Sequence, residues 1–178
     1  MRRFGLFRCL QKGIRADYLW AMPVSLPVGK EIRLRRAVRM VVSIHEFQVT
    51  TEGFTDVVDI SEQVGNAIDK SAVADGMALV SVAGSTASIT SIEYEPGVVR
   101  DLKNAIERLA PSNIKYEHDA RWGDGNGFAH VRAAMLGSSF SVPVHRGRAV
   151  LGTWQQIVLL DFDNKRRRRS IYVQIIGE

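Results

Sequence analysis

The sequence has very little cysteine, no long hydrophobic run and no internal repeat. Its single cysteine, Cys9, excludes both an intramolecular disulfide and a metal site built from several cysteines. The longest apolar runs, such as residues 77–83 and 157–160, are far shorter than the roughly 20 residues that a membrane-spanning helix needs. These absences exclude a transmembrane protein and favour a cytoplasmic one, because reducing compartments suit chains without disulfides.

The positive charge is concentrated at the amino terminus. Residues 1–39 hold 10 Lys/Arg and 2 Asp/Glu, a net charge of +8, whereas residues 40–178 hold 14 and 17, a net charge of −3. Since the larger part is mildly acidic, the overall charge of +5 is poor evidence for nucleic-acid binding. We expect a small-molecule ligand rather than a nucleic acid or a membrane.

We interpret residues 1–39 as a basic extension in front of one folded domain. Charged residues interrupt every stretch in which a secretory signal would place its apolar segment of about 7–15 residues. An arginine-rich leader also fits an organelle transit peptide or a nucleic-acid arm, and an over-long reading frame with its true start at Met40 is an equal alternative. The remaining residues, 40–178, are enough to bury a substantial core as a single domain.

Hydrophobic patterning predicts an α+β fold for residues 40–178. Helical patterns begin at residues 60, 96 and 126, and strand patterns cover residues 41–49, 54–58, 77–83, 86–93, 114–117, 139–145, 155–162 and 170–176. The first two strands are expected to form a hairpin through residues 50–53, and the apolar strand 77–83 to be buried on both faces. Because strands outnumber helices and do not alternate regularly with them, we predict a mainly antiparallel sheet or sandwich with two or three packed helices.

The densest group of polar side chains lies in residues 116–130. It contains two histidines, an asparagine, three carboxylates, an arginine and three glycines. Asn126 and His130 are four residues apart and would share one face of a helix that starts near Asn126, and His118 can fold back toward them. Two imidazoles and an oxygen ligand suit a divalent ion such as zinc, nickel or iron. Histidines twelve residues apart match no established zinc signature, so a hydrogen-bonded surface loop is the alternative.

Other candidates lie at the ends of predicted strands. Glu93, at the exit of a strand, is well placed to act as an acid, a base or a ligand. The turns 84–86 and 137–139 carry hydroxyl groups and backbone N–H groups that suit phosphate, although ordinary turn chemistry explains them equally well. Trp154 either packs in the core or stacks on a heteroaromatic ring, with Gln155 supplying amide hydrogen bonds. The sequence contains no nucleotide-binding fingerprint and no serine-nucleophile elbow.

Several of these segments occur together in a characteristic order. They are Gly84-Ser85-Thr86-Ala87, Glu93, Asp101-Leu102, Pro111, Tyr116, His118, Asn126, His130, Gly137-Ser138, Pro143, Leu151-Gly152-Thr153-Trp154-Gln155 and Ile176-Gly177-Glu178. In this series residues 40–178 resemble the YjbQ-like family, often described as secondary thiamine-phosphate synthases. Many relatives have His-Thr-Thr-Ala where this chain has Gly84-Ser85-Thr86-Ala87, which places it in a variant branch.

The resemblance implies a compact α+β subunit that assembles as a homotrimer, with a polar site near the subunit interface. It also implies a thiamine-phosphate synthase activity, which joins a pyrimidine pyrophosphate to a thiazole phosphate and releases pyrophosphate. A non-catalytic trimer that binds a metal or a small molecule and a metal-assisted hydrolase are the alternatives.

Residue roles follow from matching the family's motifs to this chain. The expected catalytic residues are His118, His130, Glu93 and Asn126, and the two histidines are the expected ligands of a divalent metal ion. The expected substrate-binding residues are Ser85, Thr86, Arg121, Arg132, Ser138, Trp154 and Gln155. Our own hypothesis, beyond the motif match, is that the metal ion, Arg121 or Arg132, and hydroxyl turns such as Ser138-Ser139 neutralise the leaving group.

Overall fold

Eight strands and four helices are formed by residues 39–178, the part of the chain that the computed structural model describes. The strands are β1 (Val41–Thr51), β2 (Asp56–Asp59), β3 (Gly76–Val82), β4 (Ala87–Ile92), β5 (Ser139–His145), β6 (Arg148–Ala149), β7 (Gln156–Asp161) and β8 (Arg167–Gly177). The helices are α1 (Ser61–Ser71), α2 (Pro96–Leu109), α3 (Glu117–Trp122) and α4 (Gly127–Leu136). The predicted α+β class is confirmed, and the predictions for residues 1–38 lie outside the described residues.

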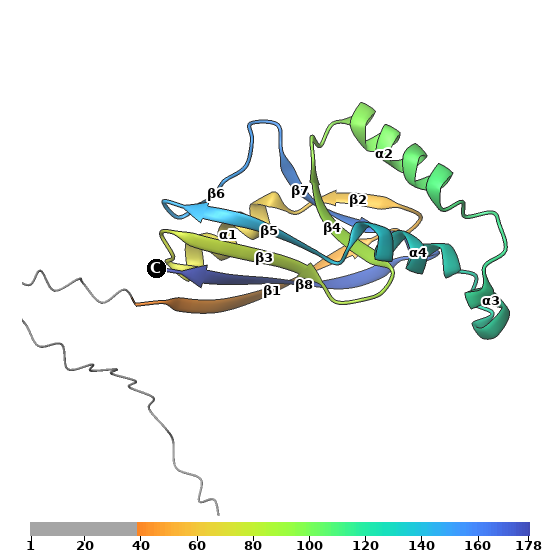
Figure 1. The fold of residues 1–178 in the computed structure, drawn as a ribbon, viewed down its shortest axis with the longest axis horizontal. Coiled ribbons are helices and arrows are strands. Elements are labelled where there is room, and N and C mark those ends of the chain that lie inside the picture. Colours follow the sequence, from red (N-terminus) through yellow and green to blue (C-terminus); the bar gives the residue numbers. More distant parts are fainter. Residues whose placement is uncertain (1–38) are drawn as a thin grey trace, which may run out of the picture. The chain divides into compact units, whose positions relative to one another are not determined.

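The strands form two antiparallel sheets. One has five strands in the order β1-β8-β3-β5-β6, and the other has three in the order β2-β7-β4 (Figure 1). The chain passes between the sheets six times, so neighbours in sequence are often in different sheets. Mainly antiparallel sheets were predicted, and this part of the prediction is confirmed.

The core has two layers of apolar side chains, one on each face of the three-stranded sheet. Ile157 and Leu159 of β7 pack with the inner face of the five-stranded sheet and with α1. Val158 and Leu160 point the other way and pack with residues of α2 and α4. Because both faces of β7 are covered, its run of consecutive apolar residues is completely buried.

The predicted hairpin between the first two strands is wrong. β1 pairs with β8 in the five-stranded sheet, whereas β2 pairs with β7 in the other sheet. Between them Phe54 and Thr55 both have positive φ, at 52° and 64°, which turns the chain out of the first sheet. The amide of Phe54 donates a 2.7 Å hydrogen bond to the carbonyl of Asp163, which holds this bend in place.

The apolar strand at residues 77–83 is buried on one face only, which corrects the expectation of burial on both. Ala78, Val80 and Val82 of β3 point into the core and are at most 4% exposed. Met77 points the other way and is 46% exposed. Side chains alternate along a strand, and no element within residues 39–178 covers the second face of this sheet.

The predicted strand at residues 114–117 is also wrong, because the helix α3 begins at Glu117 instead. Its first turn carries two carboxylates, Glu117 and Asp119, which the positive end of the helix dipole favours. Gly123 ends the helix in the left-handed conformation, with φ of 69°, and its amide bonds to the carbonyl of Asp119. This short helix lies at the end of the molecule away from the carboxyl terminus (Figure 1).

Candidate functional site

The polar segment at residues 116–130 folds into two short helices joined by a tight loop. His118 lies in α3, Asn126 immediately precedes α4, and His130 lies in the first turns of α4. The imidazole rings of His118 and His130 are 4.4 Å apart between centroids, with an angle of 35° between their planes. The structure therefore brings together the two histidines that the sequence singled out.

Three side chains converge on one point beside His118. Its Nδ1 atom lies 3.5 Å from Oδ1 of Asp119 and 3.4 Å from Oδ1 of Asp124. One donor atom from each of these three residues lies within 4.8 Å of the other two. The Nδ1 atom is shielded from solvent, yet no hydrogen-bond partner satisfies it within the described part of the chain. A buried polar atom without a partner requires an explanation, and a bound group is one.

The two carboxylates are held in place by neighbouring backbone and side-chain groups. Oδ1 of Asp119 accepts a 2.9 Å hydrogen bond from the amide of Gly127, the first residue of α4. The amide nitrogen of Asn126, turned toward Asp124, donates to its two carboxylate oxygens at 3.2 and 3.3 Å. Asn126 is only 6% exposed, so its side chain is fixed by packing and orients Asp124 rather than meeting solvent.

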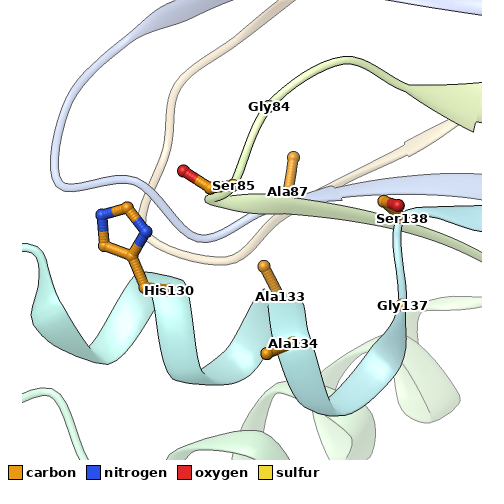
Figure 2. Close-up of a pocket in the computed structure, with 8 residues that line it drawn as sticks. All are labelled: Gly84, Ser85, Ala87, His130, Ala133, Ala134, Gly137 and Ser138. Carbon is orange, nitrogen blue, oxygen red and sulfur yellow. The ribbon is translucent and has the colours of Figure 1, made fainter.

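Two hollows meet at His130. The first, of about 370 Å³, runs along α4 between Ser85 and Ser138 and has a floor of alanines and glycines (Figure 2). The second, of about 510 Å³, extends from His130 over His118 and Asp124. Gly84 and Ser85 border both hollows, and Figure 2 shows the hydroxyl of Ser85 directed toward the side of the pocket that holds the His130 ring. The predicted residues His118, His130, Asn126, Ser85, Thr86 and Ser138 thus surround one connected space.

A buried ionic network forms the wall of the larger hollow. Arg169 donates from Nε to Oδ2 of Asp161 at 2.7 Å and from a terminal nitrogen to Oδ1 at 2.5 Å. The same guanidinium donates to the hydroxyl of Thr86, which in turn donates to Asp163 at 3.0 Å. Burial acts to raise the pKa of Asp163, but hydrogen bonds from Arg167 and Thr86 outweigh it, so this pKa lies below its ordinary value.

The two arginines expected to bind an anion have other surroundings. Arg132 is 3% exposed and donates to the carbonyl of Ala110 and to the hydroxyl of Thr55, both at 2.9 Å. It also pairs with Glu107 and therefore links α4 to the end of α2. Arg121 is exposed on α3, where its guanidinium lies 5.5 Å from the centre of the Trp122 ring. Neither residue borders the two hollows.

Glu93, Trp154 and Gln155 lie at the opposite end of β4 from Thr86, roughly 20 Å away along the strand. Gln155 donates from its amide to the hydroxyl of Ser91 at 2.8 Å and accepts from the amide of Gly152 at 3.0 Å. Trp154 is 71% exposed and is therefore not a core residue. Within one chain these three residues do not reach the pocket around His118.

Sequence reasoning missed the two carboxylates that complete the cluster. Asp119 and Asp124 were counted in the polar segment but were assigned no role. The sequence did contain a signal for Asp119, because this residue is adjacent to His118 and precedes Gly127 by eight residues. A short helix followed by a glycine turn spans eight residues and can bring Asp119 back to the amide of Gly127. The predicted metal pair was His118 and His130, whereas the atoms that converge belong to His118, Asp119 and Asp124.

Comparisons with known proteins agree with this architecture. Residues 45–178 match the family model described as UPF0047 protein YjbQ-like. The UPF0047 protein of Methanocaldococcus jannaschii is 36% identical over 136 residues, which cover 76% of this chain and 95% of that protein. A crystal structure of a YbjQ-like protein from Sulfolobus solfataricus P2 is also 36% identical, covers 79% of this chain and 100% of its own, and has a TM-score of 0.75. A Clostridium acetobutylicum protein of the yjbq/upf0047 family has a TM-score of 0.68 at 36% identity, over 74% of this chain and 98% of its own.

These comparisons confirm the resemblance and overturn the function expected from it. The curated relatives carry UPF0047 names alone, and the Sulfolobus protein is described as having unknown function. None of these descriptions contains a thiamine-phosphate synthase activity that would pass to this chain. The expectation of that activity was wrong, because it transferred a family description rather than a property of the residues.

Proposed function

The chain belongs to the YjbQ-like UPF0047 family, whose names supply no reaction, and we therefore propose its function from the site itself: the protein binds a divalent transition-metal ion. The ligands are Nδ1 of His118 and one carboxylate oxygen each from Asp119 and Asp124. The observation that carries the proposal is their convergence around an imidazole nitrogen that is shielded from solvent and has no hydrogen-bond partner.

The spacing of the ligand atoms supports an ion between them. Metal–nitrogen and metal–oxygen bonds to zinc are about 2.1 Å long, so two ligands of a tetrahedral ion are about 3.4 Å apart. The distances from Nδ1 of His118 to the two carboxylates, 3.4 and 3.5 Å, match this value. They are longer than good hydrogen bonds, which leaves room for a cation at the centre.

The distribution of charge also supports a cation. Asp161 and Asp163 are each paired with an arginine, so the wall of the hollow is electrically balanced. Within residues 39–178, Asp119 and Asp124 have ion pairs with His118 alone. A divalent ion would neutralise these two carboxylates, and a mixed nitrogen and oxygen ligand set suits zinc, manganese, iron or nickel.

The proposed ion would be accessible to a small molecule. The side chains of His118, Asp119 and Asp124 are 29%, 27% and 47% exposed, and His118 and Asp124 border the larger hollow. Three protein ligands leave at least one coordination position for water or a ligand. His130 and Ser85 border the same space and would contact a molecule bound there.

Metal content measured by mass spectrometry tests this proposal. The purified full-length chain is equilibrated with zinc, manganese or nickel and passed through a desalting column. We expect about one ion per chain in the wild type, and a loss of tenfold or more in affinity for His118→Ala and for Asp124→Asn. His145→Ala and Asp75→Asn are matched controls, because this exposed histidine–aspartate pair lies outside the site. A wild type that retains no added metal, or equal retention in His118→Ala, would contradict the proposal.

His130 provides a further test of which side chains are ligands. Its ring faces that of His118, and its nitrogens are not among the converging donor atoms. We expect His130→Ala to keep one ion per chain with an affinity close to that of the wild type. If the ion is lost instead, the ligand pair is the one predicted from the sequence, His118 and His130.

A further inference from the structure

One nitrogen of the buried Arg169 side chain is free to bind a ligand in the larger hollow. Arg169 is 8% exposed and borders that hollow. Its Nε atom and one terminal nitrogen are bonded to Asp161 and Thr86, whereas the other terminal nitrogen, Nη1, donates no hydrogen bond to any residue in the range 39–178. A guanidinium that two of its nitrogens already hold in place loses little conformational freedom when the third binds a ligand.

Gly84 lies over this nitrogen and leaves it uncovered because it has no side chain. A Cβ atom at Gly84 would be 3.2 Å from Nη1, which is tighter than an ordinary van der Waals contact. Gly84 and Ser85 are both exposed and border the same hollow. The hydroxyl of Ser85 is directed toward the side that holds the His130 ring, as Figure 2 shows. A ligand in the hollow can therefore reach Nη1 past Gly84 and a second hydrogen-bond donor on the adjacent residue.

The charged groups around the larger hollow decide which kind of ligand suits these donors. Two arginines and four aspartates lie in its wall or pair with residues that do: Arg167, Arg169, Asp119, Asp124, Asp161 and Asp163. His118, as a metal ligand, is neutral, and His130 is the remaining titratable group. A divalent ion supplies the two positive charges that the arginines lack, so the loaded site carries no excess of negative charge that would repel an anion.

We propose that the larger hollow binds a small molecule that carries an oxyanion, either a phosphate or a carboxylate group. The oxyanion accepts hydrogen bonds from Nη1 of Arg169 and from the hydroxyl of Ser85. The inference rests on the proposed function, because the metal ion is what offsets the aspartates. Donors without acceptors suit an anionic group, and charge-assisted hydrogen bonds from an arginine are among the strongest in proteins. A volume of about 510 Å³ has room for a small molecule.

Nuclear magnetic resonance titration of the full-length chain tests the proposal. Zinc-loaded, desalted protein is titrated with inorganic phosphate, with acetate and with glycerol, at an ionic strength held constant with sodium chloride. We expect at least one of the two anions to bind saturably below about 10 mM, with shifts at the amides of residues 84–86 and at the Nε–H of Arg169, and glycerol to have no such effect. The anion that binds more tightly identifies the oxyanion group. If neither anion binds in this range, or if glycerol causes the same shifts, the proposal is wrong.

Two substitutions separate this position from the rest of the hollow. Ser85→Ala removes the hydroxyl and should weaken anion binding about fivefold or more. Gly84→Ala places a methyl group over Nη1 of Arg169 and should weaken it about tenfold or more. Ser141→Ala is the control for the first change, because Ser141 is exposed on β5 and borders neither hollow. Gly147→Ala is the control for the second, because its φ of 74° is also positive and its nearest contact is an ordinary 3.9 Å. Both controls should bind like the wild type.

The metal content of the same samples distinguishes a failure of this inference from a failure of the proposed function. If the variants and the wild type hold one ion per chain and bind the anion equally, the anion position is wrong and metal binding stands. If the wild type retains no metal but loses anion affinity on Ser85→Ala and Gly84→Ala, the anion position stands and the metal proposal is wrong. Removal of zinc with EDTA should weaken anion binding about tenfold or more, since four aspartates then face two arginines. An unchanged affinity after EDTA would overturn the dependence on the ion.

Discussion

His118 shows how a residue's role depends on the atoms that surround it. Its position in a dense polar segment predicted a functional residue, and the structure places it next to His130. The sequence could not show that Asp119 and Asp124 would approach the imidazole, because that depends on the short helix α3, and the sequence predicted a strand at residues 114–117 followed by a glycine-rich loop. Arg132 shows the opposite error, since an arginine beside a polar segment suits an anion but is here buried against α2.

Asp163 makes a residue-scale prediction about acid stability. The pKa of Asp163 is lowered in the folded protein. Its carboxylate therefore contributes fully to the stability of the fold above its ordinary pKa of about 3.9. This contribution is lost as pH falls through the lowered pKa of the folded state. Asp163→Asn should lower the free energy of unfolding at pH 7 by about 1–3 kcal/mol. The difference from the wild type should shrink between pH 5 and pH 2. Urea titrations across this range measure it, with Asp101→Asn, an exposed change on α2, as the control. If the difference in free energy of unfolding between Asp163→Asn and the wild type does not change with pH, the lowered pKa of Asp163 is contradicted.

At the scale of elements, strands and long amphipathic helices were predicted better than connections. The helices α2 and α4 begin at or next to the predicted positions, because Pro96 and the apolar spacing that follows are local signals. The pairing of β1 with β8 joins residues more than a hundred positions apart, and no local pattern encodes it. The bend at Phe54 and Thr55 was missed because neither residue is a usual choice for positive φ.

Gly127 makes an element-scale prediction about the contact between α3 and α4. A Cβ atom at this position would lie 2.5 Å from Cβ of Tyr116, so a side chain there must push the two segments apart. Gly127→Ala should therefore destabilise the protein by about 1–3 kcal/mol and weaken metal binding by moving Asp119. Gly65→Ala in α1 is the control, because nothing lies within 4 Å of the added methyl group. That change should stabilise the protein by about 0.5–1 kcal/mol. Thermal unfolding measures both, and equal effects would contradict the steric explanation.

At the scale of the whole molecule, the three-stranded sheet is the centre of the fold. The apolar run at residues 157–160 predicted a buried strand, but the sequence did not show that it would be covered on both faces while β3 would not. Whether a strand is buried on one face or on both depends on how the sheets and helices stack. That stacking is decided by contacts between segments that are distant in the sequence. The same reason explains why Glu93 and Trp154 were grouped with a pocket that lies at the other end of β4.

We predict that replacing Leu159, in the centre of the fold, costs much more stability than replacing Trp154 on the surface. Leu159 is fully buried between the sheets, so Leu159→Ala should lower the free energy of unfolding by about 2–5 kcal/mol. Trp154 is 71% exposed, and Trp154→Ala should change it by less than about 0.5 kcal/mol, although the side chain lost is larger. Urea denaturation of both variants checks the contrast. A large loss in the tryptophan variant would show that its ring is covered in solution, for instance by another copy.

The carboxylate of Asp119 has two neighbours at once, the imidazole of His118 and the amide of Gly127. An ion that draws electron density from that oxygen weakens it as an acceptor for the amide. The Gly127 proton resonance should therefore move upfield when a diamagnetic ion such as zinc is added. A single backbone signal at the start of α4 thus acts as an internal indicator of occupancy, readable without any assumption about substrate.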